Sequence, residues 1–290
     1  MKYSYILLIL LILLVVNVPK GHSGEFADYL NNKSERVNDW TLMTDTPSTG
    51  LVVDNLLASA AITAWGFEKW AWGTAPFHIS SEGWFEADSK TGGSDKTGHF
   101  YMTYLLSRVL AARMEDRAWS KDKASLAGAL SGLLAMTVLE IGDGTSPYGF
   151  SYEDFIADSL GALLAYGIRA YPAVDNFLDI RLEYWPTKSY RQSGDLTTDY
   201  SGMKHLVAFR LGGFERLKDS LWGLIELQTG YYSRGYRSYD TVEPSRNVYV
   251  GLGISLSELG RRSGVNVLSN IFEFYQPGGT YVEGVVWSGH

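Results

Sequence analysis

The chain has 290 residues and a formal net charge of -7, with no basic block, so nucleic-acid binding is not expected. It contains no cysteine, which excludes disulfides and a lipid attached to an N-terminal cysteine. Its 9 Trp and 19 Tyr are typical of a protein that touches a bilayer interface or a carbohydrate, or of one with a large aromatic core.

Residues 1–24 have the layout of a secretory signal. A lysine is followed by an apolar run of about 14 residues and then by small and polar residues, which is short for a membrane span. We expect cleavage near Ser23 or Gly24, with an uncleaved N-terminal anchor as the alternative; in both cases the rest of the protein is exported. Residues 25–50 are polar and contain turn-forming stretches such as "TDTPSTG", which predict a linker.

Four segments between residues 51 and 175 predict helices. Ser94 is suited to cap the second of them, and Pro172 ends the fourth. Small residues at spacings of three and four in the last two segments would let helix backbones approach closely. The predicted helices are Val52–Trp72, Asp95–Met114, Lys123–Ile141 and Tyr152–Tyr171. None is a clean run of about 20 apolar residues, so we expect a four-helix bundle, membrane-associated as one option.

Residues 176–290 have a different residue pattern, which predicts antiparallel strands. Segments such as "HLVAFRLG", "GLIELQTGYYSRGYRSY", "RNVYVGLGISL", "IFEFYQ" and "TYVEGVVW" alternate aromatic or branched residues with polar ones and glycine. "SLSELGRRS" predicts a helix or a turn. About five segments are too few for a closed barrel of at least eight strands. The predicted fold class is therefore α+β, with a small sheet packed on the helices.

Ionisable side chains sit next to the apolar faces of three predicted helices. Asp95 and His99 are four residues apart and share a helix face. Burying a lone charge costs several kcal/mol, roughly, unless it is paired or binds a metal. We therefore expect His99, Glu140 and Asp158 to meet. The residues expected around them are Asp95, Lys96, Asp143 and Asp154.

Three interpretations of this cluster remain open. His99 with Glu140 and Asp158 is a reasonable divalent-metal site, because imidazole and carboxylate suit Zn, Fe or Mn. The same residues would also serve acid–base catalysis, with a carboxylate orienting His99, with Asp95 and His99 as an acid–base pair, and with Lys96 beside them. The third interpretation is a buried hydrogen-bonded network that fixes the register of the helices.

Two further segments carry weaker candidates. "PFHISSEGWFEAD" places His78 and Asp88 in a loop that would close over the cluster, or that would be an aromatic-anchored surface loop. "YYSRGYRSY" places Arg234 and Arg237 among tyrosines, where they would bind an anionic headgroup or a glycan, or lie on an exposed strand face.

Two of these stretches carry a family resemblance. "GGSDKTGHFYMTYLLSR" and the later "EIGDG…GFSYEDFIADSLGALLAY" resemble the bacterial YfiM-like proteins (DUF2279), predicted periplasmic lipoproteins of unknown function. They are more distantly similar to VanZ-like helical membrane proteins, in which Asn tends to stand where this chain has Asp158. The resemblance implies no reaction. It implies shared polar positions at Asp95, Lys96, His99, Glu140, Asp154 and Asp158.

These observations predict a cell-envelope protein of the periplasm or outer membrane of a Gram-negative bacterium, with inner-membrane anchoring as the alternative. Its expected role is structural or the binding of membrane lipid or glycan. The alternative is an envelope hydrolase or transferase acting on a lipid or cell-wall precursor, with a divalent metal as the one candidate cofactor.

Overall fold

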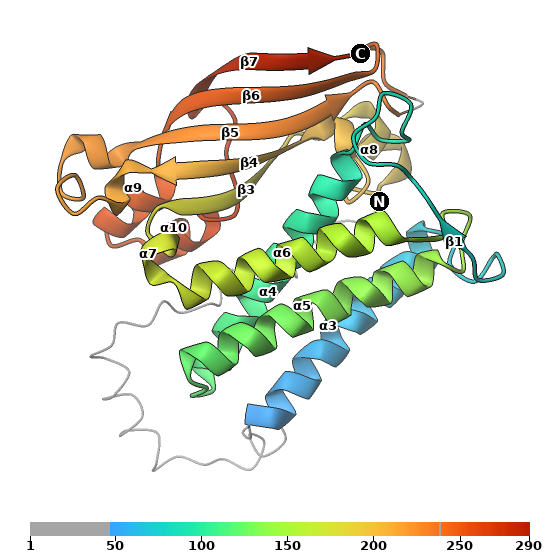
Figure 1. Ribbon diagram of the computed structural model, residues 1–290, viewed down its shortest axis with the longest axis horizontal. Helices are drawn as coiled ribbons and strands as arrows, with labels where there is room; N and C mark the ends of the chain where they lie inside the picture. Colours follow the sequence, from blue (N-terminus) through green and yellow to red (C-terminus); the bar gives the residue numbers. More distant parts are fainter. Residues whose placement is uncertain (1–46, 238) are drawn as a thin grey trace.

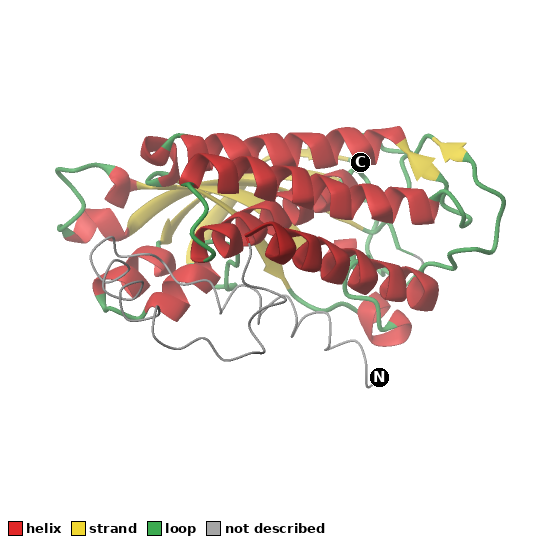
Figure 2. Cartoon of the chain, turned by 90° about the horizontal axis from the view of Figure 1, so that it is seen from below, coloured by secondary structure: helices red, strands yellow, loops and turns green. Residues whose placement is uncertain are grey.

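A computed structural model describes residues 47–237 and 239–290 of the chain. Long helices lie beneath a five-stranded antiparallel sheet (Figure 1), and Figure 2 shows the same helices from below, in front of the strands. The predicted α+β class is confirmed. The predicted signal segment 1–24 and most of the predicted linker 25–50 lie outside the described residues.

Four long helices occupy the predicted region. They are α3 (Pro47–Lys69), α4 (Ser94–Asp116), α5 (Lys121–Asp143) and α6 (Tyr152–Ala170). α4 packs along both α5 and α6, whereas α3 rests mainly on α5 and touches α4 less. α4 is therefore the central helix, and its Tyr104 and Met114 are completely buried.

Glycines allow this close packing of α4. A Cβ at Gly132 of α5 would lie 2.2 Å from Ser107 Oγ, and a Cβ at Gly161 of α6 would lie 2.3 Å from the carbonyl oxygen of Phe100. Such distances leave no room for any larger residue. The small-residue spacing read from the sequence thus brings the backbones of α5 and α6 against α4.

Two helix starts differ from the prediction. α3 begins at Pro47 rather than Val52, since proline is well suited to the first turn of a helix. Ser94 is not the N-cap of α4: Gly93 takes that position with a left-handed φ of 83°, which favours glycine. The Ser94 hydroxyl is instead 2.8 Å from that of Ser233 on the sheet, so it joins α4 to the C-terminal half.

The sheet is a meander in sequence order. Its strands are β3 (Leu178–Tyr184), β4 (Met203–Arg210), β5 (Ile225–Arg234), β6 (Ser245–Ile254) and β7 (Tyr281–Gly289). Ile180 of β3 packs with Tyr101 and Tyr104 of α4, so the sheet lies on the helices as expected.

Two predictions for this half need correction. "IFEFYQ" does not form a strand, because its first two residues end helix α10 (Asn266–Phe272) and one isolated bridge, at Tyr275, follows. β3 was not among the predicted strands. "SLSELGRRS" does contain a helix, α9 (Leu256–Arg262).

The remaining elements are short. They are β1 (Ile79–Ser80), β2 (Phe150–Ser151), α7 (Pro172–Asp175), α8 (Lys188–Ser193), and the 3-10 turns Tyr200–Gly202, Leu211–Gly213 and Leu221–Leu224. β1 and β2 pair in parallel and tie the loop after α3 to the start of α6.

Two described helices are long and apolar enough to cross a membrane, Ser48–Lys69 and Lys121–Asp143. Half of the apolar window of α5 is buried inside the protein, as in a core helix, whereas for α3 the buried share is 22%. α3 therefore presents most of its apolar surface outside the packed core.

Candidate functional site

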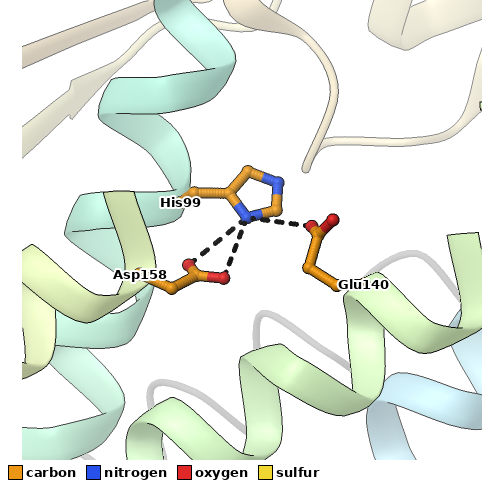
Figure 3. Close-up of side chains that lie close together, drawn as sticks. All are labelled: His99, Glu140 and Asp158. Carbon is orange, nitrogen blue, oxygen red and sulfur yellow. Dashed lines mark hydrogen bonds and ion pairs between the residues drawn. The ribbon is translucent and has the colours of Figure 1, made fainter. Parts of the chain in front are cut away.

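The structure brings His99, Glu140 and Asp158 together from three helices (Figure 3). Nδ1 of His99 on α4 lies 3.3 Å from Oδ1 of Asp158 on α6 and 3.5 Å from Oε1 of Glu140 on α5. Glu140 and Asp158 are fully buried, and the His99 side chain is 13% exposed. The close packing of α5 and α6 on α4 produces this convergence.

A second group of carboxylates surrounds Lys96, one turn before His99. The Nζ atom of Lys96 lies 2.8 Å from Asp154, 3.0 Å from Asp95 and 3.4 Å from Glu82. Asp154 joins the two groups, because its Oδ1 atom is also 3.9 Å from Nε2 of His99. We call the eight residues Glu82, Asp95, Lys96, His99, Glu140, Asp143, Asp154 and Asp158 the acidic cluster.

Asp95 does not pair with His99, contrary to the expectation. Within the described residues no ion pair joins the two side chains. Asp95 instead accepts from Lys96 at 3.0 Å and from the Thr91 hydroxyl at 2.5 Å. A charged ammonium on the adjacent residue is a stronger partner for a carboxylate than an imidazole one turn away.

Lys96 is poorly suited to act as a base. Burial lowers the pKa of its ammonium, but Asp95 and Asp154 more than offset this effect and raise that pKa above the ordinary 10.5. Lys96 therefore stays charged at neutral pH, and its role in the cluster is electrostatic.

The pKa values around His99 reflect an excess of carboxylates. Burial lowers the pKa of His99, but Asp154 and Asp158 raise it well above the ordinary 6.5. Burial raises the pKa of Glu140 to about 8, with the neighbouring aspartates adding to the effect and His99 opposing it. The described cluster is therefore short of positive charge.

The other predicted site residues lie in different environments. Asp143 accepts a hydrogen bond from Nε1 of Trp72 at 2.6 Å, and burial raises its pKa to about 6. His78 and Asp88 are exposed and do not join the cluster. Their loop does reach the cluster, through Glu82, which sequence reasoning missed because a single acid in an irregular loop has no periodicity.

A cavity of about 610 Å³ connects the acidic cluster to an apolar trough. Its wall follows one stripe of α4 from Asp95 through Met102 and Leu106 to Arg113. The 18 residue-to-residue steps from Asp95 to Arg113 correspond to about 27 Å of helix. The trough is completed by α3 and α5, with side chains that include Ala58, Ala61, Ile62, Trp65, Met136 and Leu139.

The C-terminal half also contributes to the cavity wall. Tyr200 and Arg237 line the polar end, with the Arg237 guanidinium 4.9 Å from the centre of the Tyr200 ring. Arg237 was a sequence candidate, whereas Tyr200 was missed because nothing near it in the sequence marks it. Arg234 is not part of this wall and lies 4.4 Å from the centre of the Tyr232 ring.

Residues 81–170 match the family described as "Predicted periplasmic lipoprotein (DUF2279)". This segment is similar to members of that family. It contains all eight residues of the acidic cluster, whereas α3 and the sheet lie outside it. The family supports an exported, periplasmic or envelope location, as the sequence predicted.

The VanZ-like resemblance stays a prediction. No curated protein matches the chain, and no solved structure matches it. Because these 290 residues contain no cysteine, none of them can carry the cysteine-linked lipid that the family description suggests.

Proposed function

We propose that this protein binds an amphiphilic lipid of the cell envelope, with the acyl chain in the trough along α4 and the polar head at the acidic cluster. The observation that carries the proposal is the single cavity that joins these two chemically different ends. Ligand cavities are typically about 300–1,000 Å³ and mostly apolar, with a few convergent polar groups.

The dimensions of the trough suit an acyl chain. One leaflet of a bilayer is about 15 Å of hydrocarbon, half of a core of about 30 Å. The part of the α4 stripe beyond the acidic cluster, from Met102 to Arg113, spans about 17 Å and matches this length. Leu57 of α3 lines the trough and is still 63% exposed, so a chain can enter from the side of α3.

The exposed surface of α3 supports a position near a membrane. Val52, Leu56 and Phe67 are more than half exposed, although α3 is apolar enough to span a bilayer. Exposed apolar patches of this kind mark interaction surfaces. A glycan is a poorer fit for the same cavity, because the middle of the trough offers few polar partners.

A second candidate function is an enzyme that hydrolyses or transfers the lipid head. His99 favours this candidate, since it borders the cavity and the carboxylates keep it protonated, as a general acid requires. Turnover of a radiolabelled envelope lipid that disappears in His99→Gln, without loss of lipid binding, would support the enzyme.

Filling the trough tests lipid binding. Ala61→Phe places a ring in the cavity, and we expect at least a tenfold loss of affinity for a fluorescent fatty acid and loss of lipid that co-purifies in native mass spectrometry. Ala64→Phe is the matched control, because Ala64 is exposed on the same helix and does not line the cavity.

The comparison requires that both variants are folded, with thermal unfolding temperatures within a few degrees of that of the parent protein. Equal lipid binding by both variants and the parent would contradict the proposal.

A further inference from the structure

We propose that His99, Glu140 and Asp158 form a site for one divalent transition-metal ion, such as Zn²⁺, with an open position facing the cavity. The site would lie at the polar end of the proposed lipid cavity but does not depend on lipid binding. Imidazole and carboxylate are ordinary ligands of Zn²⁺, and three protein ligands with one open position are typical of its reactive sites.

The spacing of the donor atoms fits a metal better than direct contact. Zn–N and Zn–O bonds of about 2.0–2.2 Å in a tetrahedral site place the ligand atoms about 3.3–3.6 Å apart. The His99 Nδ1 atom is 3.3 Å from Asp158 and 3.5 Å from Glu140, and all three donor atoms lie within 4.8 Å of one another. Direct bonds between charged groups are shorter, about 2.7–2.9 Å.

A second observation is independent of this spacing. The Oε1 atom of Glu140 is buried and has no hydrogen-bond partner among the described residues, and it points at His99 (Figure 3). The other oxygen of this carboxylate is fixed by the backbone N–H of Ser151 at 3.0 Å. One oxygen of Glu140 is thus held in place while the other is free to bind an ion.

A neighbouring hydroxyl orients Asp158, and a further carboxylate lies on the far side of His99. The Thr103 hydroxyl lies 2.7 Å from Oδ1 of Asp158, and the far nitrogen of His99 faces Asp154 at 3.9 Å. A hydroxyl in such a position fixes the orientation of a carboxylate ligand.

The adjacent carboxylates form a second cation site, which a side chain of the protein already occupies. Glu82, Asp95 and Asp154 also lie close enough to share a cation, but the Lys96 ammonium occupies the space between them at 2.8–3.4 Å. His99 contacts Glu140 and Asp158 from one side only, at the longer distances of 3.5 and 3.3 Å, and a bound metal ion would displace any proton that its Nδ1 atom carries. A divalent ion would supply the missing positive charge.

Zinc titration of the chelator-treated full-length protein tests this inference. We expect one Zn²⁺ per chain by isothermal calorimetry and elemental analysis, and an increase in the thermal unfolding temperature. Glu140→Gln and Asp158→Asn should each weaken binding at least tenfold. His78→Ala is the matched control and should bind as the parent does, because His78 is exposed and outside the cluster.

Co²⁺ gives a readout that a structural role would not move. The visible absorption of a tetrahedral site should appear with the parent and be absent in His99→Gln. Saturable Zn²⁺ binding that is unchanged in Glu140→Gln and Asp158→Asn, or no stoichiometric binding by the folded parent, would overturn the inference. Ala61→Phe should still bind Zn²⁺, so failure of the lipid proposal and failure of this one are distinguishable.

Discussion

Two buried groups of charges in this molecule are built in opposite ways. The acidic cluster lies between the helices, and the second group, Arg181, Arg210, Asp179 and Glu226, lies on the inside of the sheet. We call the second group the arginine network. Arg181 donates to Glu226 at 2.7 and 2.9 Å and to Asp179 at 2.5 Å, and Arg210 lies 3.1 Å from Asp179.

The arginine network balances its charges. Its guanidinium groups match its carboxylates, the contacts are short, and Gln276 fills a further position at 2.7 Å from Arg181. None of its residues lines the described cavity. The acidic cluster has excess carboxylates, longer contacts around His99 and an open side. Balanced, close contacts indicate a structural role, whereas unbalanced and spaced groups indicate a ligand.

Removing a cation from the arginine network should have the largest effect. Arg181→Met leaves Asp179 and Glu226 buried beside unfilled space, and we expect a loss of about 3–5 kcal/mol in the free energy of unfolding. Chemical denaturation measures this loss. Arg262→Met is the control, because exposed Arg262 pairs with Glu258 at 2.9 Å and such pairs contribute about 1 kcal/mol or less. Equal losses in the two variants would remove the distinction between the regions.

Two histidines with opposite pKa shifts extend the comparison to pH. Burial lowers the pKa of His205 to about 3, whereas the acids around His99 raise its pKa. The folded state therefore binds fewer protons at His205 than the unfolded state does between pH 6.5 and pH 3. The contribution of His205 to the free energy of unfolding should fall by about 1.4 kcal/mol per pH unit as the pH drops through this window.

His205→Gln isolates this effect. Its side chain can keep a hydrogen bond to the Thr97 hydroxyl, which lies 2.9 Å from Nδ1 of His205. We expect the difference in stability between parent and variant to shrink or reverse as the pH falls below 6.5. Parallel stability curves for the two proteins from pH 7 to pH 4 would show that His205 does not resist protonation.

The same contrast explains what the sequence could predict. His99, Glu140 and Asp158 stand out because each interrupts an apolar helical pattern, and helix geometry then directs them inward. Lys96 was placed beside them but without its partners, because the choice among several nearby carboxylates is made by tertiary packing.

The sheet was harder to predict from the sequence than the acidic cluster. In β3, Asp179 and Arg181 are buried as members of the arginine network. Charged residues usually indicate an exposed position, so the sequence of this strand does not look like that of a buried strand. Their partners Glu226 and Gln276 lie far away in the sequence. No local pattern could identify this network or the strand that carries its first two members.

Neutralising one acid of the acidic cluster should have the smallest effect, and of the opposite sign. The raised pKa of Glu140, about 8, means that its ionisation costs stability as the pH rises from 4.5 through 8. Glu140→Gln removes this cost, whereas the same loss of charge in the arginine network, in Glu226→Gln, would leave Arg181 without its bidentate partner.

The free energy of unfolding of Glu140→Gln and of the parent at pH 8.5, with a chelator present, measures this difference. We expect the variant to be more stable than the parent by about 1–2 kcal/mol, and Glu226→Gln to be less stable. A loss of more than about 1 kcal/mol in Glu140→Gln would mean that ionised Glu140 stabilises the fold by pairing with His99, and that the acidic cluster is a self-sufficient ion-pair network rather than a ligand site.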